Sequence, residues 1–244
     1  TIEELPISLQ TKKIMVSALN LIKRKIIPRA LCNSVLTVLI CLLPLLIGLA
    51  HNIYRPYTMT PDADLIYLGQ VLRLADGLDQ TYFDHTGHSY ILALFCWLKF
   101  WSIFGLIPEP SELTAITVLD IDTYIQSLTI ASRGFSIVMG GFFTILVIWG
   151  SRSLQLSWRV SLAVGLLFSL SQGLTAQALI IRAEMLSAMG GFAVFFALAR
   201  SQNSNGWAHI FWMMLVGVMA IIALDAKVQV FIVLLALPLV SLPL

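Results

Sequence analysis

The sequence predicts an all-α protein that crosses a membrane several times. Of its 244 residues, 58% are hydrophobic and only 11% are charged, and the mean hydropathy is +0.88. Soluble domains carry about 25% charged and about 45–50% apolar residues. The net charge of +2 supplies no basic surface for a phosphate backbone. This composition excludes a soluble globular protein, a disordered chain and a nucleic-acid partner.

Six apolar runs predict six membrane-spanning helices, since a helix needs about 20 mostly apolar residues to cross a bilayer. They are residues 30–50, 127–150, 160–179, 185–199, 207–224 and 228–244. A seventh run, 88–107, is long enough but carries Lys99 at its middle. A lysine at the bilayer centre costs about 2.5–3.5 kcal/mol on insertion scales. We therefore expect 88–107 to lie in the interface rather than to cross.

The distribution of basic residues orients these spans. Six of the fifteen precede the first span, which places the N-terminus in the cytoplasm. Residues 1–29 then form a cytoplasmic amphipathic basic segment, and 30–244 form the transmembrane domain. An outer loop over 54–123 carries interfacial helices 64–76 and 88–107, the first ending at Asp76-Gly77. Eleven of the thirteen acidic residues fall on the outer side in this arrangement.

Two groups in the outer loop have side chains suited to chemistry. Asp62 and Asp64 follow the first span closely and can bind a cation or act as a base. Their alternative role is to cap helix 64–76, because an acidic side chain accepts hydrogen bonds from the first N–H groups of a helix. Asp84 and His85 lie in a cluster with two tyrosines and a second histidine. Metal binding and an aromatic belt both fit that cluster.

Further charged residues lie near the ends of the predicted spans. Arg133 falls inside the second span, Arg182 and Glu184 precede the fourth, and Asp225 and Lys227 follow the fifth. Ionisable groups at such depth are costly and often functional. Residues two apart do not face each other on a helix, so their partners are expected to come from other segments. Together they offer carboxylates for proton abstraction and cations for phosphate.

The order of these motifs resembles the GT-C superfamily of membrane glycosyltransferases, over about residues 35–244. The bacterial aminoarabinose transferases, the protein mannosyltransferases and related polyprenyl-phosphate-sugar enzymes are the most similar in pattern. The matching stretches are Asp62 to Leu68 with Arg73 and Gly77, Phe83 to Tyr90, Ser132 to Gly134 with Gly150 to Leu154, Ile181 to Glu184, and Leu224 to Lys227. Two departures stand out: Ala63 separates the acidic pair, and Thr86-Gly87 replaces the family's two prolines.

This resemblance implies a GT-C-like fold and sugar transfer from a polyprenyl-phosphate-linked donor on the extracytoplasmic face of a bacterial inner membrane. Asp64 is then the base that deprotonates the acceptor, with Asp62 as its substitute, because Arg73 follows Asp64 at a family-like spacing. Arg182 and Lys227 bind the donor phosphate.

The resemblance also implies roles for further residues and partners. Asp84, His85 and Glu184 support the acceptor or a metal, and a divalent cation, Mg²⁺ or Mn²⁺, is used by some superfamily members. Helix 88–107 is expected to form one wall of a groove for the prenyl chain. The lipid-linked donor, membrane lipids and further membrane subunits are the expected partners, and the chain is expected to be part of a longer enzyme.

Two other functions fit the same sequence. A non-catalytic GT-C-like scaffold subunit of a larger membrane complex is favoured by the altered motifs. A transporter would place its charges near the midplane, often on repeated halves. No repeat relates the halves here, and the charges lie toward one edge of the predicted membrane domain.

Overall fold

The structure is a computed structural model that describes residues 26–50, 53–59, 63–81 and 87–235. Side chains are described from Cys32 onward, except those of Ala63 and Asp64. Every regular element in these ranges is a helix, which confirms the predicted all-α class. The predicted N-terminal segment 1–29 falls almost wholly outside the described residues.

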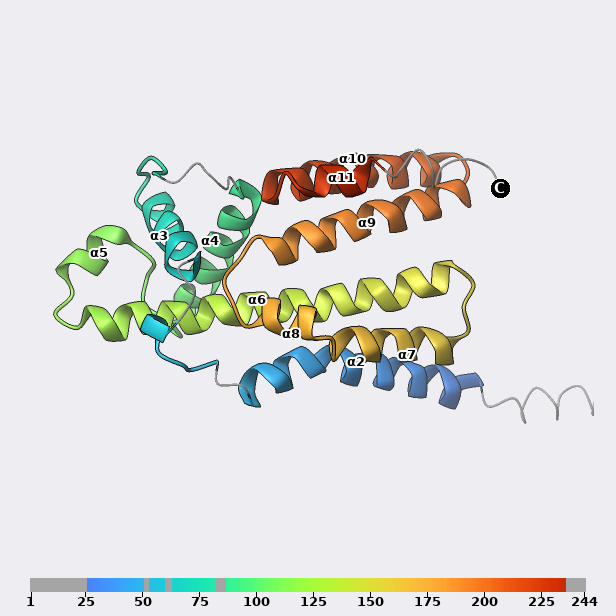
Figure 1. The fold of residues 1–244 in the computed structure, drawn as a ribbon, viewed down its shortest axis with the longest axis horizontal. Coiled ribbons are helices and arrows are strands. Elements are labelled where there is room, and N and C mark those ends of the chain that lie inside the picture. The colour runs from blue at the N-terminus through green and yellow to red at the C-terminus, as the bar shows by residue number, and fades with distance from the viewer. Residues whose placement is uncertain (1–25, 51–52, 60–62, 82–86, 236–244) are drawn as a thin grey trace, which may run out of the picture. The chain divides into compact units, whose positions relative to one another are not determined.

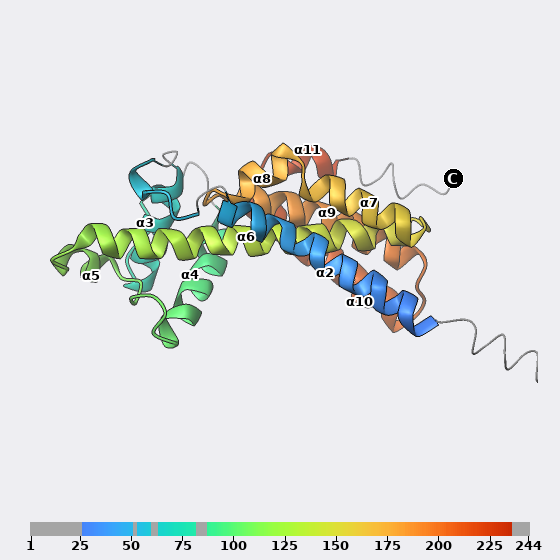
Figure 2. The ribbon, with the colours of Figure 1, turned by 90° about the horizontal axis from the view of Figure 1, so that it is seen from below.

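The helices follow one another with short connections (Figures 1 and 2). They are α2 (Ile26–Ala50), the 3₁₀ turn η1 (Tyr57–Met59), α3 (Ala63–Ala75), α4 (His88–Ile103), α5 (Glu112–Thr117), α6 (Ile121–Ser153), α7 (Trp158–Ser169), α8 (Gln172–Ala178), α9 (Glu184–Gln202), α10 (Trp207–Ala226) and α11 (Val230–Leu234). The chain forms two units that divide within α2, after Val38. In the first unit, Thr37 donates to the carbonyl of Asn33 within α2. The remaining description concerns the second unit.

Three helices in the described ranges are long and apolar enough to cross a membrane, and the bent pair α7–α8 raises the number to four. The three include Cys32–Ala50 of α2, α6 and α10, and the pair α7–α8 bends by 57° at its break. Apolar side chains of α10 such as Phe211, Met214 and Ile221 are exposed. Because water disfavours such a surface, lipid is its natural environment, and the protein is an integral membrane protein.

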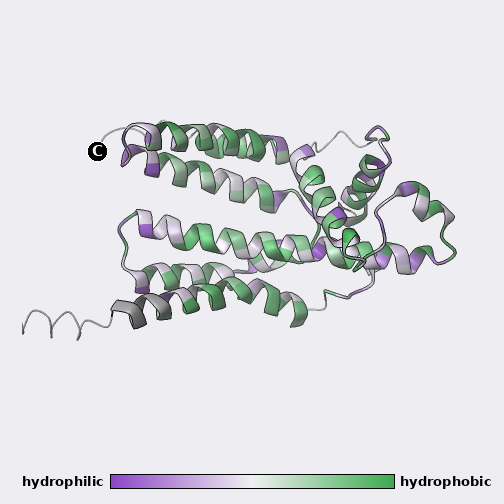
Figure 3. Cartoon of the chain, turned by 180° about the vertical axis from the view of Figure 1, so that it is seen from behind, coloured by the Kyte–Doolittle hydropathy of each residue, from purple (hydrophilic) through white to green (hydrophobic). Residues whose placement is uncertain are grey.

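Figure 3 shows the same division by hydropathy: α9 and α10 are largely hydrophobic along their length, with hydrophilic residues gathered near their ends. The predicted span 185–199 is present as α9, with 19 residues, but it is not one of the helices that meet the length and composition test. The last predicted span begins as α11 and then leaves the described part of the chain.

The two helices predicted in the loop 54–123 are present as α3 and α4. Helix α3 ends where expected, because Gly77 adopts a φ of +69° and the N–H of Leu78 donates to the carbonyl of Arg73. Helix α4 begins at His88 as predicted but ends at Ile103, four residues early. Gly105, with a φ of +67°, turns the chain there. With 16 residues, α4 is shorter than a typical span, and Lys99 pairs with Glu109 beyond its end.

The 33-residue helix α6 lies at the centre and contacts α3, α4, α7, α8 and α9. Asp120 caps its first turn by accepting from the backbone N–H of Thr123. Helices α9 and α10 pack antiparallel along their length (Figure 1). Small residues permit this close approach: a Cβ added to Gly190 would lie 3.0 Å from Ala223 Cβ, and Ser187 donates to the Ala223 carbonyl at 2.9 Å.

Candidate functional site

The start of α9 and the end of α10 carry an ion pair. Lys227 Nζ lies 2.5 Å from Glu184 Oε1, and both side chains are largely buried, with 20% and 28% of their surface exposed. Residues 184 and 227 are far apart in sequence, which confirms the prediction that these charges find partners in other segments. The pair joins the ends of two helices that pack along their whole length.

Asp225, at the end of α10, binds the start of α4 beside this ion pair. The N–H of Gly87 donates to the Asp225 carbonyl at 2.9 Å, and the N–H of Ser89 donates to its carboxylate at 2.5 Å. A carboxylate at a helix start satisfies N–H groups that have no partner within the helix. Gly87 suits this position because its φ of +48° lies in the left-handed region, and its Cα lies close to Ala183 and Tyr67, each 3.4 Å from where a Cβ would stand. Segments α3, α4, α9 and α10 therefore meet at one junction.

Arg182 adds a second cation at this junction. It lies two residues before Glu184 and acts on that carboxylate electrostatically. Its Nε is buried and has no hydrogen-bond partner among the described residues, and the same holds for Glu184 Oε2. A buried donor and a buried acceptor thus remain available to a bound group.

A cavity of about 600 Å³ opens beside the ion pair, and Glu184 and Lys227 both line it. Its other walls are almost entirely apolar and come from α6, α9, α11 and the residue before α11. They are Phe143, Phe192, Phe195, Val230 and Val233, with Ser187, Ala188, Gly191 and Gln229. A cavity with charge at one end and hydrocarbon elsewhere suits an amphiphile. The predicted groove wall, 88–107, does not line it: α4 reaches only the junction.

The other predicted site residues are placed less completely. Asp62, Asp84 and His85 lie outside the described residues. Asp64 belongs to the first turn of α3, and its side chain is not described. Tyr67, one turn later, packs its ring edge-to-face against Tyr90 of α4, 5.3 Å between centroids, so the start of α3 lies close to the junction. In the parts of the chain that are described, no three His, Cys, Asp or Glu residues gather as a metal site would need.

Arg182 is not among the residues that line the cavity, although Lys227 is. Arg73, which favoured Asp64 as the base, binds Glu112 at 3.1 Å and the Asp79 carbonyl at 2.8 Å. It thereby attaches α3 to α5. The N–H of Leu113 at the start of α5 donates to Asp76, and this bond holds the pKa of Asp76 below its usual value.

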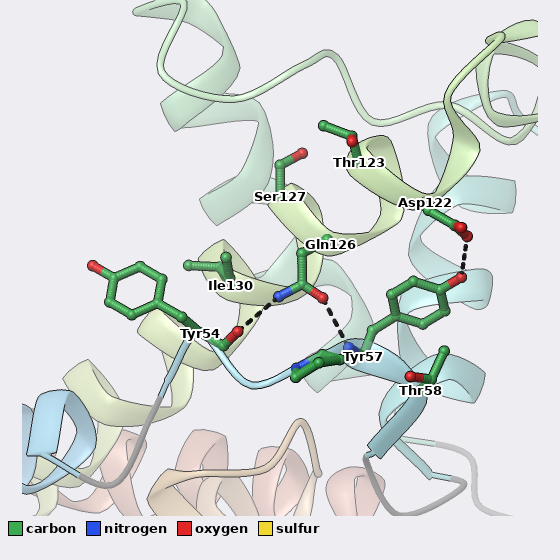
Figure 4. Close-up of a pocket in the computed structure, with 9 residues that line it drawn as sticks. Tyr54, Tyr57, Thr58, Asp122, Thr123, Gln126, Ser127 and Ile130 are labelled. Carbon is green, nitrogen blue, oxygen red and sulfur yellow. Dashed lines mark hydrogen bonds between the residues drawn. The ribbon is translucent and has the colours of Figure 1, made fainter.

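A second cavity, of about 650 Å³, lies between the segment 54–58 and the first turns of α6 (Figure 4). Its polar groups mainly bind each other. The Tyr57 hydroxyl donates to Asp122 at 2.6 Å, and Gln126 accepts from the Tyr57 N–H while it donates to the Tyr54 carbonyl. These contacts attach the segment to α6, so we assign this cavity a structural role.

Arg133 also attaches the segment after α2 to α6. It is completely buried in α6, and its Nη1 donates to the carbonyls of Ile53 and Arg55 at 2.9 and 2.7 Å. Arg55 in turn donates to the carbonyl of Leu179 after α8. The charge predicted to be a candidate for function within the second span therefore fixes the chain that follows the first span.

Sequence reasoning left several parts of the site unassigned. Asp225 received no role of its own, although its place at the end of an apolar run was a signal. Phe192 and Phe195, at i and i+3 of one helix, marked a common face, but nothing in the sequence paired that face with Phe143 or Val233. Comparison of the chain with protein-family models, with curated proteins and with solved structures gives no match.

Proposed function

We propose that the protein transfers a sugar from a polyprenyl-phosphate-linked donor to an acceptor at the extracytoplasmic side of a bacterial inner membrane, in a GT-C-like fold. One observation carries the proposal: Lys227 and Glu184 stand at one end of an otherwise apolar cavity of about 600 Å³. A lipid-linked phosphate needs this combination, a cation for the phosphate and hydrocarbon for the chain beside it.

The neighbouring groups support a transfer reaction. The activated sugar already carries a phosphate leaving group, so the protein must stabilise charge on the departing phosphate and deprotonate the acceptor. Lys227 uses one of its three N–H donors on Glu184, and Arg182 brings a buried Nε–H without a partner in the described chain. Cations in a poorly hydrated site stabilise such charge strongly. Asp64, in the helix that packs on the junction through Tyr67, is the proposed base.

Helix lengths support additional crossings in the proposed topology. Glu184 and Arg200 stand 16 residues apart on α9, which is about 24 Å at 1.5 Å per residue. The hydrocarbon core is about 30 Å thick, so the two charges lie close to opposite interfaces when α9 crosses beside α10. With the span predicted over 228–244, the proposed number of spans is six, and the proposed side of the ion pair is extracytoplasmic.

Photocrosslinking tests donor binding directly. A benzoyl-phenylalanine at Val233, an exposed residue that lines the cavity, is expected to crosslink radiolabelled undecaprenyl phosphate. The same group at Val218, equally exposed on α10 but outside the cavity, is the matched control. Unlabelled undecaprenyl phosphate should compete, and the uncharged undecaprenol should not. Equal labelling at both positions, or equal competition by the alcohol, refutes the assignment.

Activity tests the base. Asp64→Asn is expected to abolish sugar transfer in membranes with expression and insertion unchanged, whereas Asp79→Asn, an exposed acid after α3, should retain it. Full activity of Asp64→Asn would remove Asp64 from the mechanism.

A non-catalytic scaffold subunit is the second candidate, and the charge balance favours it. The junction holds two cations, Arg182 and Lys227, and two carboxylates, Glu184 and Asp225, so it is formally neutral, and its contacts tie α4, α9 and α10 together. A scaffold would purify with a stoichiometric membrane partner and leave lipid-linked sugars unchanged, and Lys227→Gln would then disrupt the complex rather than the crosslink.

A further inference from the structure

A third cavity, of about 420 Å³, lies at the end of the helices where α6 and α9 finish and where α7 and α10 begin. Its lining combines two arginines, three tryptophans and a hydroxyl: Arg152, Arg200, Trp149, Trp158, Trp212 and Ser153. None of these residues takes part in the ion-pair junction at the start of α9.

Both arginines lie over indole rings. The Arg152 guanidinium carbon is 5.1 Å from the Trp158 ring centroid, and that of Arg200 is 5.6 Å from Trp212. Attraction of the cation to the ring does not require all five N–H donors of a guanidinium, so donors remain for a bound anion. Arg152 donates one N–H group, from Nη1, to the Leu156 carbonyl. The Arg200 guanidinium makes no hydrogen bond or ion pair with any described residue and contacts only the Trp212 ring.

No acidic residue is close in sequence to neutralise this end. Residues 123–183 and 185–224 contain no Asp or Glu, although they contain Arg152, Arg159 and Arg200. Among the described residues neither Arg152 nor Arg200 has a carboxylate partner. Two such cations suit an anion, and Arg binds phosphate oxygens through paired N–H donors. Tryptophan is enriched where a membrane protein meets the lipid headgroups. The adjacent surface is apolar, with Phe211, Met214 and Val160 exposed.

We propose that this cavity binds the phosphate of an anionic phospholipid, with Arg152 and Arg200 on the phosphate, Ser153 as a further donor, and the acyl chains along the exposed faces of the helices. The site requires neither sugar transfer nor a particular orientation in the membrane, so it stands independently of the proposed function.

Native mass spectrometry of the full chain tests the site. The protein is released from micelles that contain equal amounts of phosphatidylglycerol and phosphatidylcholine, and the retained lipids are counted. The wild type should retain phosphatidylglycerol in preference. Arg152→Gln/Arg200→Gln should weaken that binding about thirtyfold, since each arginine near an anionic surface contributes about a fivefold factor. Arg159→Gln, an exposed arginine at the same end that does not line the cavity, is the matched control and should bind normally.

Tryptophan fluorescence separates loss of binding from loss of folding, because three tryptophans line the cavity. Brominated phosphatidylglycerol should quench the wild type more than brominated phosphatidylcholine does, and the double variant should lose this difference while it keeps its helical circular dichroism. An equal effect of Arg159→Gln would show a diffuse charge attraction and overturn the site. Displacement of the lipid by millimolar glycerol 3-phosphate would likewise overturn the lipid assignment in favour of a soluble phosphate ester.

Discussion

Removal of either charge from the Glu184–Lys227 pair is expected to lower the free energy of unfolding by an amount that depends on how deeply the pair is buried. Exposed ion pairs contribute about 0.2–1 kcal/mol. Breaking a fully buried pair costs about 3–5 kcal/mol, because it leaves an uncompensated charge. This pair lies between the two limits, since about a quarter of each side chain is exposed. We therefore expect about 2 kcal/mol for a single variant.

The two single variants should not be equivalent. In Lys227→Met, the Glu184 carboxylate retains the electrostatic influence of Arg182. In Glu184→Gln, the Lys227 ammonium loses its ion-pair partner, and Arg182 also loses the carboxylate that it influences. The Glu184 variant should therefore be the less stable of the two. A domain of this size loses about 2–4 °C in Tm for each kcal/mol, which predicts a loss of about 4–8 °C.

A double-mutant cycle measures the pair itself. Thermal unfolding in detergent, followed by tryptophan fluorescence, is recorded for the wild type, both single variants and Glu184→Gln/Lys227→Met. The double variant should be more stable than the sum of the single losses predicts, with a coupling energy of about 1–2 kcal/mol. Arg159→Gln, which removes an exposed charge, should leave the Tm within about 1 °C, as surface substitutions usually do. A coupling energy near zero would refute the claim that the pair joins α9 to α10.

Three further predictions concern other parts of the molecule. Gly165→Ala should cost about 1–3 kcal/mol relative to Gly173→Ala, because the new Cβ would lie 2.4 Å from Ile148 Cγ1 at position 165 and meets nothing within 4 Å at position 173. Both substitutions gain the same helix propensity, so equal Tm values of the two variants would contradict this packing. Since the folded pKa of Asp76 is lowered, its contribution to stability is complete above the unfolded pKa of about 4 and is lost as the pH falls through the folded pKa. Asp76→Asn keeps an acceptor for the Leu113 N–H but does not titrate, so its Tm should fall less than that of the wild type between pH 6 and pH 3, and identical acid profiles would contradict the assignment. Cysteine labelling tests the topology in a variant without Cys32, Cys41 and Cys96. A cysteine at the exposed Ile116 of α5 should react with an impermeant thiol reagent from outside the cell, and one at the exposed Leu154 after α6 should react only after permeabilisation. The reverse pattern would invert the proposed topology.

Local signals predicted most of the helices. Helix α3 was expected at 64–76 and spans Ala63–Ala75, because Asp76-Gly77 is a strong local stop. The regions of α6 and α10 were found from their apolar runs alone. The end of α4 was placed four residues late, since an apolar run does not reveal that Gly105 turns the chain. The bend between α7 and α8 was also missed, because both halves read as one apolar stretch.

The site was predicted only as a set of residue types. Sequence spacing showed that Glu184 and Lys227 needed partners elsewhere, and it could not show that they are each other's partners. It also gave Arg133 the same standing as these residues, although Arg133 holds backbone carbonyls of the segment after α2. Whether a costly buried charge serves chemistry or architecture depends on which groups lie around it, and those groups come from distant parts of the chain.

The amino-acid sequence by itself determined that this chain is helical and belongs in a membrane, because hydropathy and helix signals act over a few neighbouring residues. Only the tertiary structure decided that the end of α10, the start of α9 and the start of α4 meet, and that an apolar cavity opens beside their ion pair. Such meetings depend on how helices pack through small residues such as Gly190 and Ala223, and packing of this kind joins residues that the sequence keeps far apart.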